Sequence, residues 1–432
     1  MNRIFALLVL AAFGTAAFRE FRGAPAMEAL SRAMLESASG AVQLVIGLVG
    51  AMALFLGLVR IAEEGGLLRL IARLIQPLLQ RLFPDVPAGH PAMGAMVLNL
   101  SANVLGLGNA ATPFGIRAMQ ELDRLNPAPG TATDAMVLFL AINTSSVTLL
   151  PTGVIALRAA AGSADPAAIL PTTLFATACS TAAAILSAKL LEGRRPGPRP
   201  SAADGAGTRP NAAAEAAAGR GEEAACELPP PLPLWGSALL LLGLLLLIGL
   251  LLTFGRGVSP WVLPSLMVGF LLFGWFRGVR LYEAFVAGAR GGLEVAARIL
   301  PYLVAVLVAV GMLRASGALD ALVGWVGPFT AAIGLPAEAL PVALTRPLSG
   351  SGAFALLASL LQDPAVGPDS YTGLLASTLQ GSTETTFYVI AVYFGAVQVR
   401  RLRHALAPAL IADATGVLAS VAACRFLFGG VG

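Results

Sequence analysis

Residues 41–59 have the sequence AVQLVIGLVGAMALFLGLV, an apolar run without a charged side chain that ends at Arg60. An α-helix needs about 20 mostly apolar residues to cross the hydrocarbon core of a bilayer. Gly47, Gly50 and Gly57 within the run are small residues of the kind that let transmembrane helices approach one another closely. The run therefore predicts a membrane-spanning helix.

The composition extends this prediction to the whole chain. Of its 432 residues, 57% are hydrophobic and only 12% are charged, against about 25% charged residues in soluble domains. An ordinary soluble enzyme is therefore excluded. The net charge of +4 comes from arginines placed beside apolar segments rather than from a basic run, so we expect no nucleic-acid partner.

Apolar segments recur along the chain and divide it into two membrane halves. Residues 4–18 form a short apolar run that we expect to be a retained helix rather than a cleaved leader. Between the halves, residues 192–232 are rich in Ala, Gly and Pro and have no apolar periodicity, which predicts a disordered linker. Further spans are expected at 91–110, 134–157, 167–190, 233–254, 261–276, 293–314, 336–361, 371–397 and 405–428. The fold class is therefore an all-α polytopic membrane protein with halves at 1–191 and 233–432.

The two halves share a pattern of glycine and proline. Gly66 precedes Pro77 by eleven residues, and Gly317 precedes Pro328 by the same number. Residues 66–83 alternate leucines with Arg and Gln at helical spacing, which predicts an amphipathic arm helix kinked near Pro77. We predict a duplication; whether the halves are inverted in the membrane stays open. In this register Asn99 and Ser101 lie opposite Ser349 and Ser351, and residues 143–148 lie opposite 381–386.

Four stretches within the apolar segments are unusually polar and are interrupted by Gly or Pro: 99–113, 143–152, 345–352 and 377–386. Backbone that leaves the helix at membrane depth is tolerated only where it is buried in protein or lines a cavity. The other interpretation is helix packing through small and hydroxyl side chains. On the first interpretation, broken or re-entrant helices bind a solute through Asn99, Ser101, Asn103, Asn109, Asn143, Thr144, Ser145, Ser146, Arg346, Ser349, Ser351, Gln380, Ser382, Thr383, Glu384 and Thr385.

Two of these residues carry a charge. An ionisable side chain at the centre of a membrane helix costs about 2.5 to 3.5 kcal/mol on insertion scales and marks a functional site by default. Arg346 and Glu384 therefore either bind solute or a proton, or pair with each other as a structural bridge; both interpretations predict that they lie close together. Asp413, in the last span, is a third candidate that packing alone also explains.

Residues for other chemistry are scarce. His90 and His404 are the only histidines, the three cysteines are far apart in sequence, and the common hydrolase, nucleotide and zinc motifs are missing. We therefore expect no catalytic residues, no metal site and no cofactor. The protein is not expected to be an enzyme.

Several runs resemble a known family. His90–Met96, Leu105–Pro113 and Ala141–Thr148 resemble spore maturation protein A, and Arg346–Gly352 with Gln380–Tyr388 resembles spore maturation protein B. The resemblance implies a fusion of the two, with a nucleoside-recognition or gate domain in each half, similar to those of concentrative nucleoside transporters and ferrous-iron transporter B proteins. It also implies a location in the bacterial cytoplasmic (inner) membrane.

These observations favour a secondary transporter, or a channel-like permease, for a small polar solute that is nucleoside-like or anionic. The solute would bind near the membrane midplane between the repeats. Arg346 would hold an anionic or carbonyl group, and Glu384 would act in coupling to a proton or sodium ion. A homo-oligomer is compatible with the sequence. The alternative is a non-transporting membrane scaffold or gating protein that acts on a partner.

Overall fold

The computed structural model describes residues 2–87, 89–106, 108–194 and 261–429, with single residues between 242 and 250. Most of the predicted linker at 192–232 and of the predicted span at 233–254 lies outside the described residues. The side chain of Asn109 also lies outside them. The predicted domain boundaries therefore stay a prediction.

The described residues form α-helices with short 3-10 turns, and no strand element occurs among them. Four of the helical segments are long and apolar enough to cross a membrane: Ala26–Glu64, Pro166–Glu192, Leu281–Ala315 and Leu406–Phe428. The prediction of an all-α polytopic membrane protein is confirmed.

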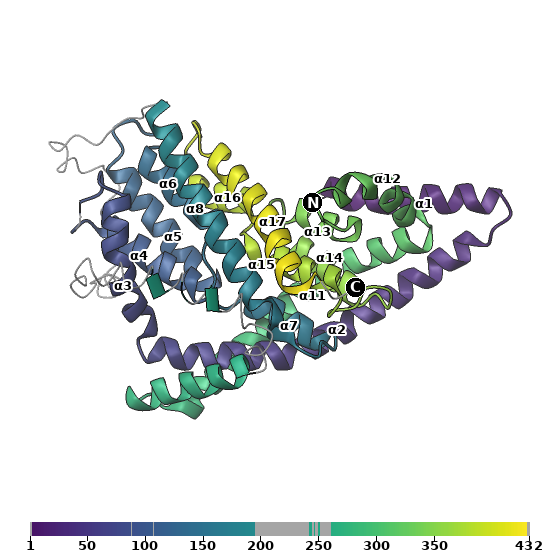
Figure 1. Ribbon diagram of the computed structural model, residues 1–432, viewed down its shortest axis with the longest axis horizontal. Coiled ribbons are helices and arrows are strands. Elements are labelled where there is room, and N and C mark those ends of the chain that lie inside the picture. The colour runs from purple at the N-terminus through teal and green to yellow at the C-terminus, as the bar shows by residue number, and fades with distance from the viewer. Residues whose placement is uncertain are drawn as a thin grey trace.

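The helices of the two halves follow one another in the same order (Figure 1). The first half contains α1 (Asn2–Phe21), α2 (Ala26–Glu64), α3 (Leu67–Leu82), α4 (Pro91–Val104), α5 (Gly108–Arg124), α6 (Asp134–Thr144), α7 (Thr152–Ala160), η1 (Pro166–Ile169) and α8 (Leu170–Arg194). The second half contains a helix at Trp261–Phe276, α11 (Leu281–Ala315), α12 (Ala318–Ala331), η3 (Ala337–Ala339), α13 (Leu340–Thr345), α14 (Gly350–Leu361), α15 (Tyr371–Ser382), α16 (Thr386–Ala396) and α17 (Leu406–Phe428). Helices α2 to α8 thus correspond to α11 to α17.

The shared glycine and proline pattern has a structural basis in α3 and α12. Gly66 and Gly317 precede these helices with φ of 84° and 75°, a left-handed conformation that glycine adopts without steric cost. Pro77 and Pro328 lie inside the two helices. The same turn therefore starts the same element in each half, while the role of α3 as an arm stays a prediction.

Helices α2 and α11 correspond to each other and pack antiparallel over much of their length. Gly288 of α11 lies against Leu56, and Gly292 lies against Ala53. A Cβ on Gly292 would be 2.6 Å from the backbone nitrogen of Ala53, so only glycine fits there. The two glycines are four residues apart, the GxxxG spacing that brings membrane helices into close contact.

Helices α8 and α17 form a second antiparallel pair of corresponding helices (Figure 1). The Ser180 hydroxyl donates to the carbonyl of Ala412 at 2.8 Å near the middle of the pair. Towards one end Leu170 shares a buried cluster with Leu427, and towards the other Ala188 shares a cluster with Ala405. Corresponding helices that run in opposite directions are typical of inverted repeats, which answers the question that the sequence left open.

The residue-by-residue correspondence that the sequence predicts between the two halves does not hold at the first helix break. Asn99 and Ser101 lie inside α4, whereas Ser349 is the N-cap of α14 and Ser351 lies in its first turn. The break after α13 comes early at Pro347, which has no backbone N–H to continue the helix, although Arg346 before it still has helical backbone. The prediction that Asn99 and Ser101 occupy positions equivalent to Ser349 and Ser351 is therefore wrong.

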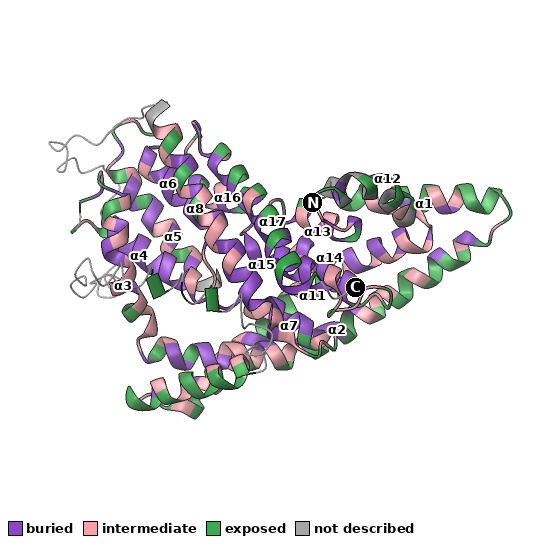
Figure 2. Cartoon of the chain, in the orientation of Figure 1, coloured by how far each residue is buried: buried purple, intermediate pink, exposed green. Residues whose placement is uncertain are grey.

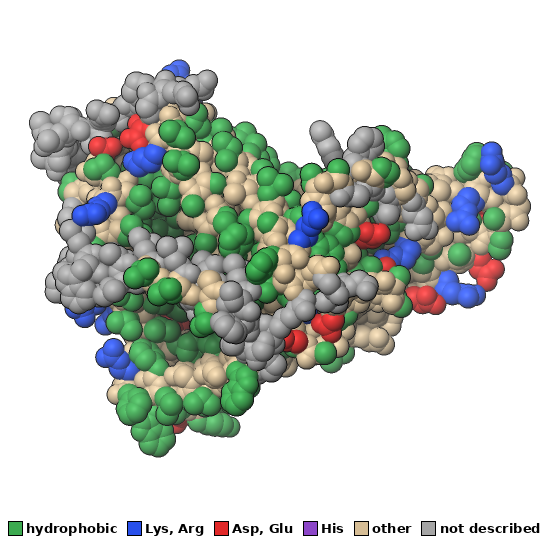
Figure 3. Space-filling model, in the orientation of Figure 1, with side chains coloured by type: hydrophobic (Ala, Val, Ile, Leu, Met, Phe, Trp, Pro, Cys, Tyr) green, Lys and Arg blue, Asp and Glu red, His purple; other side chains and the backbone are tan. Residues whose placement is uncertain are grey.

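Burial separates the interior of the bundle from a lipid-like surface. Buried residues concentrate where α4 to α8 meet α14 to α17, and exposed ones follow α1 and the outer parts of α2 (Figure 2). Ile46 of α2 and Phe426 of α17 are 69% and 71% exposed. In Figure 3 hydrophobic side chains are frequent over the middle of the face, and the charged ones gather towards its right-hand end and its left edge. Such a surface suits contact with hydrocarbon rather than water.

Candidate functional site

Four helix breaks meet around one cavity in the described part of the chain. The breaks separate α4 from α5, α6 from α7, α13 from α14 and α15 from α16. The cavity has a volume of about 630 Å³, within the range of about 300 to 1,000 Å³ that small-molecule sites occupy. Polar groups from the breaks form one part of the wall, and Met52, Phe55, Leu56 and Val295 of α2 and α11 form an apolar part.

The breaks of the two halves are joined through their backbones. The amide of Glu384 donates to the carbonyl of Thr144 at 2.9 Å, which connects the α15–α16 break with the end of α6. Within the second half, the amide of Phe387 donates to the carbonyl of Pro347 at 3.0 Å. Backbone groups freed from helices at membrane depth must find such partners, so these contacts hold the breaks around the cavity.

Arg346 and Glu384 lie together at the wall of the cavity. Arg346 is only 9% exposed; it donates to the Thr385 hydroxyl at 3.3 Å and to the carbonyl of Thr383. Its Nη2 lies 3.5 Å from the Glu384 carboxylate, whose side chain is 45% exposed, and its Nε is buried without a hydrogen-bond partner. The two charges are therefore close, as both interpretations required. The pair is long, and the carboxylate remains accessible.

A chain of amides and one hydroxyl extends the polar wall. Asn99 donates to the hydroxyl of Tyr393 at 3.1 Å, and that hydroxyl donates to Oδ1 of Asn143 at 3.3 Å. Asn103 donates to the same Asn143 oxygen at 2.9 Å. Gly115 makes room for the tyrosine, because a Cβ there would lie 2.1 Å from the hydroxyl oxygen. Tyr393, from the second half, therefore joins three asparagines of the first.

Three helices begin at the cavity and direct their N-termini towards it. Ser349, Gly350 and Ser351 at the start of α14 line the wall, and Ser349 caps that helix by accepting from the amide of Gly352 at 3.0 Å. Thr385 precedes α16 and makes no side-chain cap bond, and Thr152 begins α7. Helix N-termini carry partial positive charge. Together with Arg346 they make this wall favourable for a negatively charged group.

Sequence comparison places these breaks in a known domain. The family model described as Gate, nucleoside recognition, matches residues 45–161 and 296–400, which include all four breaks. The chain belongs to this family. Spore maturation protein B of Bacillus subtilis (strain 168) is 46% identical over 168 residues, which make up 39% of this chain and 93% of that protein. Spore maturation protein A of the same organism is 43% identical over 160 residues, 37% of this chain and 82% of that protein. The predicted fused A/B relationship with a Gate domain in each half is confirmed.

Of the residues predicted from the sequence, one group lines the Gate cavity and another lies behind it. Ser101, Thr144 and Ser382 are buried and donate to carbonyls of their own helices, which is the packing interpretation of such hydroxyls. The wall includes Asn103, Asn143, Arg346, Ser349, Ser351, Glu384 and Thr385. Behind it lie Asn99, Ser101, Thr144, Ser145, Ser146, Gln380, Ser382 and Thr383.

Other wall residues were not predicted. The cavity wall also includes Tyr393 and Tyr388 of α16 and Thr112 of α5. A tyrosine in an apolar span needs a hydrogen-bond partner when it is buried, and that was the signal for Tyr393. Among the described residues no group of three or more His, Cys, Asp or Glu side chains is placed to hold a metal ion.

Asp413 lies outside the matched Gate segments and outside the cavity wall. It is 6% exposed in α17, and its Oδ2 accepts from the Thr386 hydroxyl at 2.7 Å. Its Oδ1 is buried without a hydrogen-bond partner. The carboxylate therefore supports the start of α16 from behind the break that carries Glu384.

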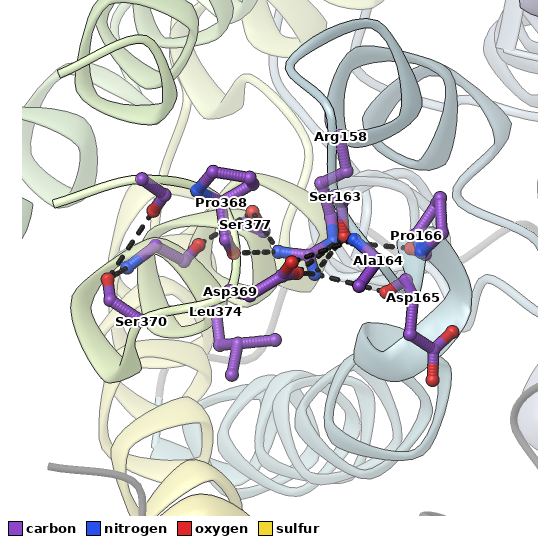
Figure 4. A network of polar contacts seen from close by, with 12 residues as sticks. Arg158, Ser163, Ala164, Asp165, Pro166, Pro368, Asp369, Ser370, Leu374 and Ser377 are labelled. Carbon is purple, nitrogen blue, oxygen red and sulfur yellow. Dashed lines mark hydrogen bonds and ion pairs between the residues drawn. The ribbon is translucent and has the colours of Figure 1, made fainter. Parts of the chain in front are cut away.

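Two arginines hold the halves together at the starts of α6 and α15. Arg158 of α7 is fully buried and contacts Asp369, directly before the N-cap of α15, at 2.9 Å (Figure 4). Arg403, before α17, contacts Asp134 in the first turn of α6 at 2.7 Å. Each half therefore supplies an arginine that contacts the start of a helix in the other half, and each of these helices ends at a break beside the cavity.

Proposed function

We propose that the protein is a secondary transporter, or a channel-like permease, for a small polar solute that is nucleoside-like or anionic. The observation that carries the proposal is the cavity of about 630 Å³ at the helix breaks of both halves, with Arg346 and the accessible Glu384 in its wall. In secondary transporters built from inverted repeats, solutes bind near the midplane at discontinuous helices.

The wall suggests a role for each group. Arg346 would hold an anionic or carbonyl group of the solute, and the amides of Asn103 and Asn143 would form hydrogen bonds with its polar atoms. Glu384 would act in coupling to a proton or a sodium ion. No catalytic step is part of this proposal, and the bacterial cytoplasmic (inner) membrane is the proposed location.

The test is uptake into liposomes that contain the purified protein. We expect at least one solute from a panel of nucleosides, organic anions and amino acids to accumulate when a proton or sodium gradient is imposed. Arg346→Ala and Glu384→Gln should abolish or uncouple this uptake. Glu192→Gln serves as the matched control, because Glu192 pairs with Lys189 at 3.0 Å outside the cavity and should not change uptake.

A negative result has a defined meaning. If no member of the panel is taken up or bound by the folded protein, the transport proposal fails. The alternative of a non-transporting scaffold that acts on a partner would then be favoured. It predicts a complex that co-purifies with the protein and persists in the Glu384→Gln variant.

A further inference from the structure

We infer that the cavity binds a monovalent carboxylate at Arg346, and that Glu384 is an internal competitor for this arginine, so that the carboxylate binds together with one proton. This inference rests on the proposed function, which left the solute and its coupling open. It defines the charge of the solute and the stoichiometry of the proton.

The first observation is an incomplete set of partners around Arg346. Its Nε is buried without a hydrogen-bond partner, although the side chain lines the cavity. Buried polar groups are almost always hydrogen-bonded, so this guanidinium has an unused donor. The guanidinium fork matches the two oxygens of a carboxylate.

The second observation is that Glu384 holds Arg346 only loosely. The distance between Nη2 and the carboxylate is 3.5 Å, whereas charge-assisted N–H···O bonds measure about 2.7 to 2.9 Å. The Glu384 side chain is 45% exposed, so it can turn away without unpacking the protein. Arg346 keeps its bonds to Thr383 and Thr385 when that happens.

The third observation is the charge of the wall. Among the described wall residues Arg346 is the one cation and Glu384 the one anion. The N-terminus of α14 at Ser351 adds partial positive charge. An arriving carboxylate beside an ionised Glu384 would place two negative charges at one arginine, and such pairs favour protonation of one of them. With Glu384 protonated, a single positive charge remains, which matches a monovalent rather than a divalent anion.

The charges balance in this exchange. Before binding, Arg346 and Glu384 are oppositely charged and neutral as a pair. After binding, Glu384 carries the added proton and Arg346 is neutralised by the carboxylate, so carboxylate and proton enter together without net charge. No covalent bond is formed or broken.

The other titratable groups near Glu384 are few. Arg346 faces it from the end of α13, and Asp413 lies behind the break on α17, bonded to the Thr386 hydroxyl. Tyr388 and Tyr393 are the phenols of α16 at the wall, and α6 contributes the uncharged side chain of Asn143 and the backbone carbonyl of Thr144. The described wall residues of α2 and α11 carry no charge: Met52, Phe55, Leu56 and Val295.

Binding of benzoate to the purified protein in detergent tests the site, with benzamide as the neutral analogue of the same shape. We expect benzoate to bind at least about tenfold more tightly than benzamide and to bring one proton per anion, measured by calorimetry in buffers of different ionisation enthalpy. Its affinity should fall by about tenfold per pH unit once Glu384 is ionised, as one linked proton requires. Glu384→Gln should bind benzoate without this pH dependence, Arg346→Ala should lose benzoate binding, and Glu192→Gln should behave as the wild type.

Three results separate the inference from the proposed function. Equal binding of benzoate and benzamide, or an unchanged pH dependence in Glu384→Gln, overturns the inference. Uptake of uridine into liposomes without uptake or binding of benzoate overturns the inference and leaves transport standing. Benzoate binding with the expected proton linkage, but no uptake of any solute, supports the site and overturns transport.

Discussion

Replacing Asp369 by alanine should destabilise the protein, because it leaves the charge of Arg158 buried between the halves. The Asp369 carboxylate accepts from Nη2 of Arg158 at 2.9 Å, from the Ser163 hydroxyl at 2.5 Å and from the Ala164 amide at 2.8 Å. Arg158 is 0% exposed, so its charge depends on hydrogen bonds within the protein.

The magnitude follows from what remains around the guanidinium. Removing one partner of a buried ion pair costs about 3 to 5 kcal/mol. Arg158 would keep the carbonyls of Pro166, Asp165 and Pro368 as acceptors, and Asp369 is itself 44% exposed. We therefore expect the free energy of unfolding to fall by about 3 kcal/mol, the lower end of that range.

The assay is SDS titration in mixed micelles, which reports the free energy of unfolding of a membrane protein. Arg158→Met in the same background removes the stranded charge, so the double variant should cost less than the sum of the two single changes, by about 2 kcal/mol. The partly exposed pair of Lys189 and Glu192 is the control, and Glu192→Ala should cost no more than about 1 kcal/mol. If Asp369→Ala unfolds at the wild-type SDS concentration, or if the single changes add without coupling, the reasoning is refuted.

Three further substitutions test close contacts elsewhere. Gly292→Val should lower the free energy of unfolding by at least about 1 to 3 kcal/mol, because a Cβ there would lie 2.6 Å from the Ala53 backbone. Unfolding in SDS measures this change, and unchanged stability would contradict the close packing of α2 and α11. Gly106→Ala should cost at least about 2 kcal/mol, because φ is +76° and a Cβ would lie 2.3 Å from the carbonyl oxygen of Leu150; a wild-type midpoint in SDS would contradict it. Tyr393→Phe should cost about 1 to 3 kcal/mol, because it removes one hydrogen-bond partner each from the buried amides of Asn99 and Asn143; a thermal midpoint equal to the wild type would show that the hydroxyl contributes nothing.

The sequence predicted the parts of the fold that depend on local chemistry. The apolar run at 41–59 lies in α2, and Gly66 and Gly317 start corresponding helices with a left-handed residue. Each prediction used only neighbouring residues, through apolar length or a required backbone conformation. The predicted correspondence of Asn99 with Ser349 failed because it was extended past Pro347, whose missing backbone N–H ends the helix early.

Contacts between the halves could not be predicted in the same way. Tyr393 reaches Asn99 and Asn143, and Arg158 reaches Asp369, across more than 200 positions of the chain. No spacing rule connects residues so far apart, and the sequence did not reveal that the halves are inverted. The polar breaks were found because an interrupted helix in lipid is costly wherever it occurs. Which of their side chains face the cavity depends on the partner half.

Charge within an apolar context was too coarse a signal for a functional residue. It marked Arg346, yet Arg158 lies in an equally apolar helix and is even more deeply buried. The partners distinguish them: Arg158 donates from all three of its nitrogens to carbonyls, hydroxyls and Asp369, whereas Arg346 keeps an unpartnered Nε and a loose contact to an accessible Glu384. A saturated guanidinium gains little from a ligand and fixes the structure. An unsaturated one at a cavity gains a hydrogen bond when a ligand arrives, and that difference is why the binding experiment is directed at Arg346 and the stability experiment at Arg158.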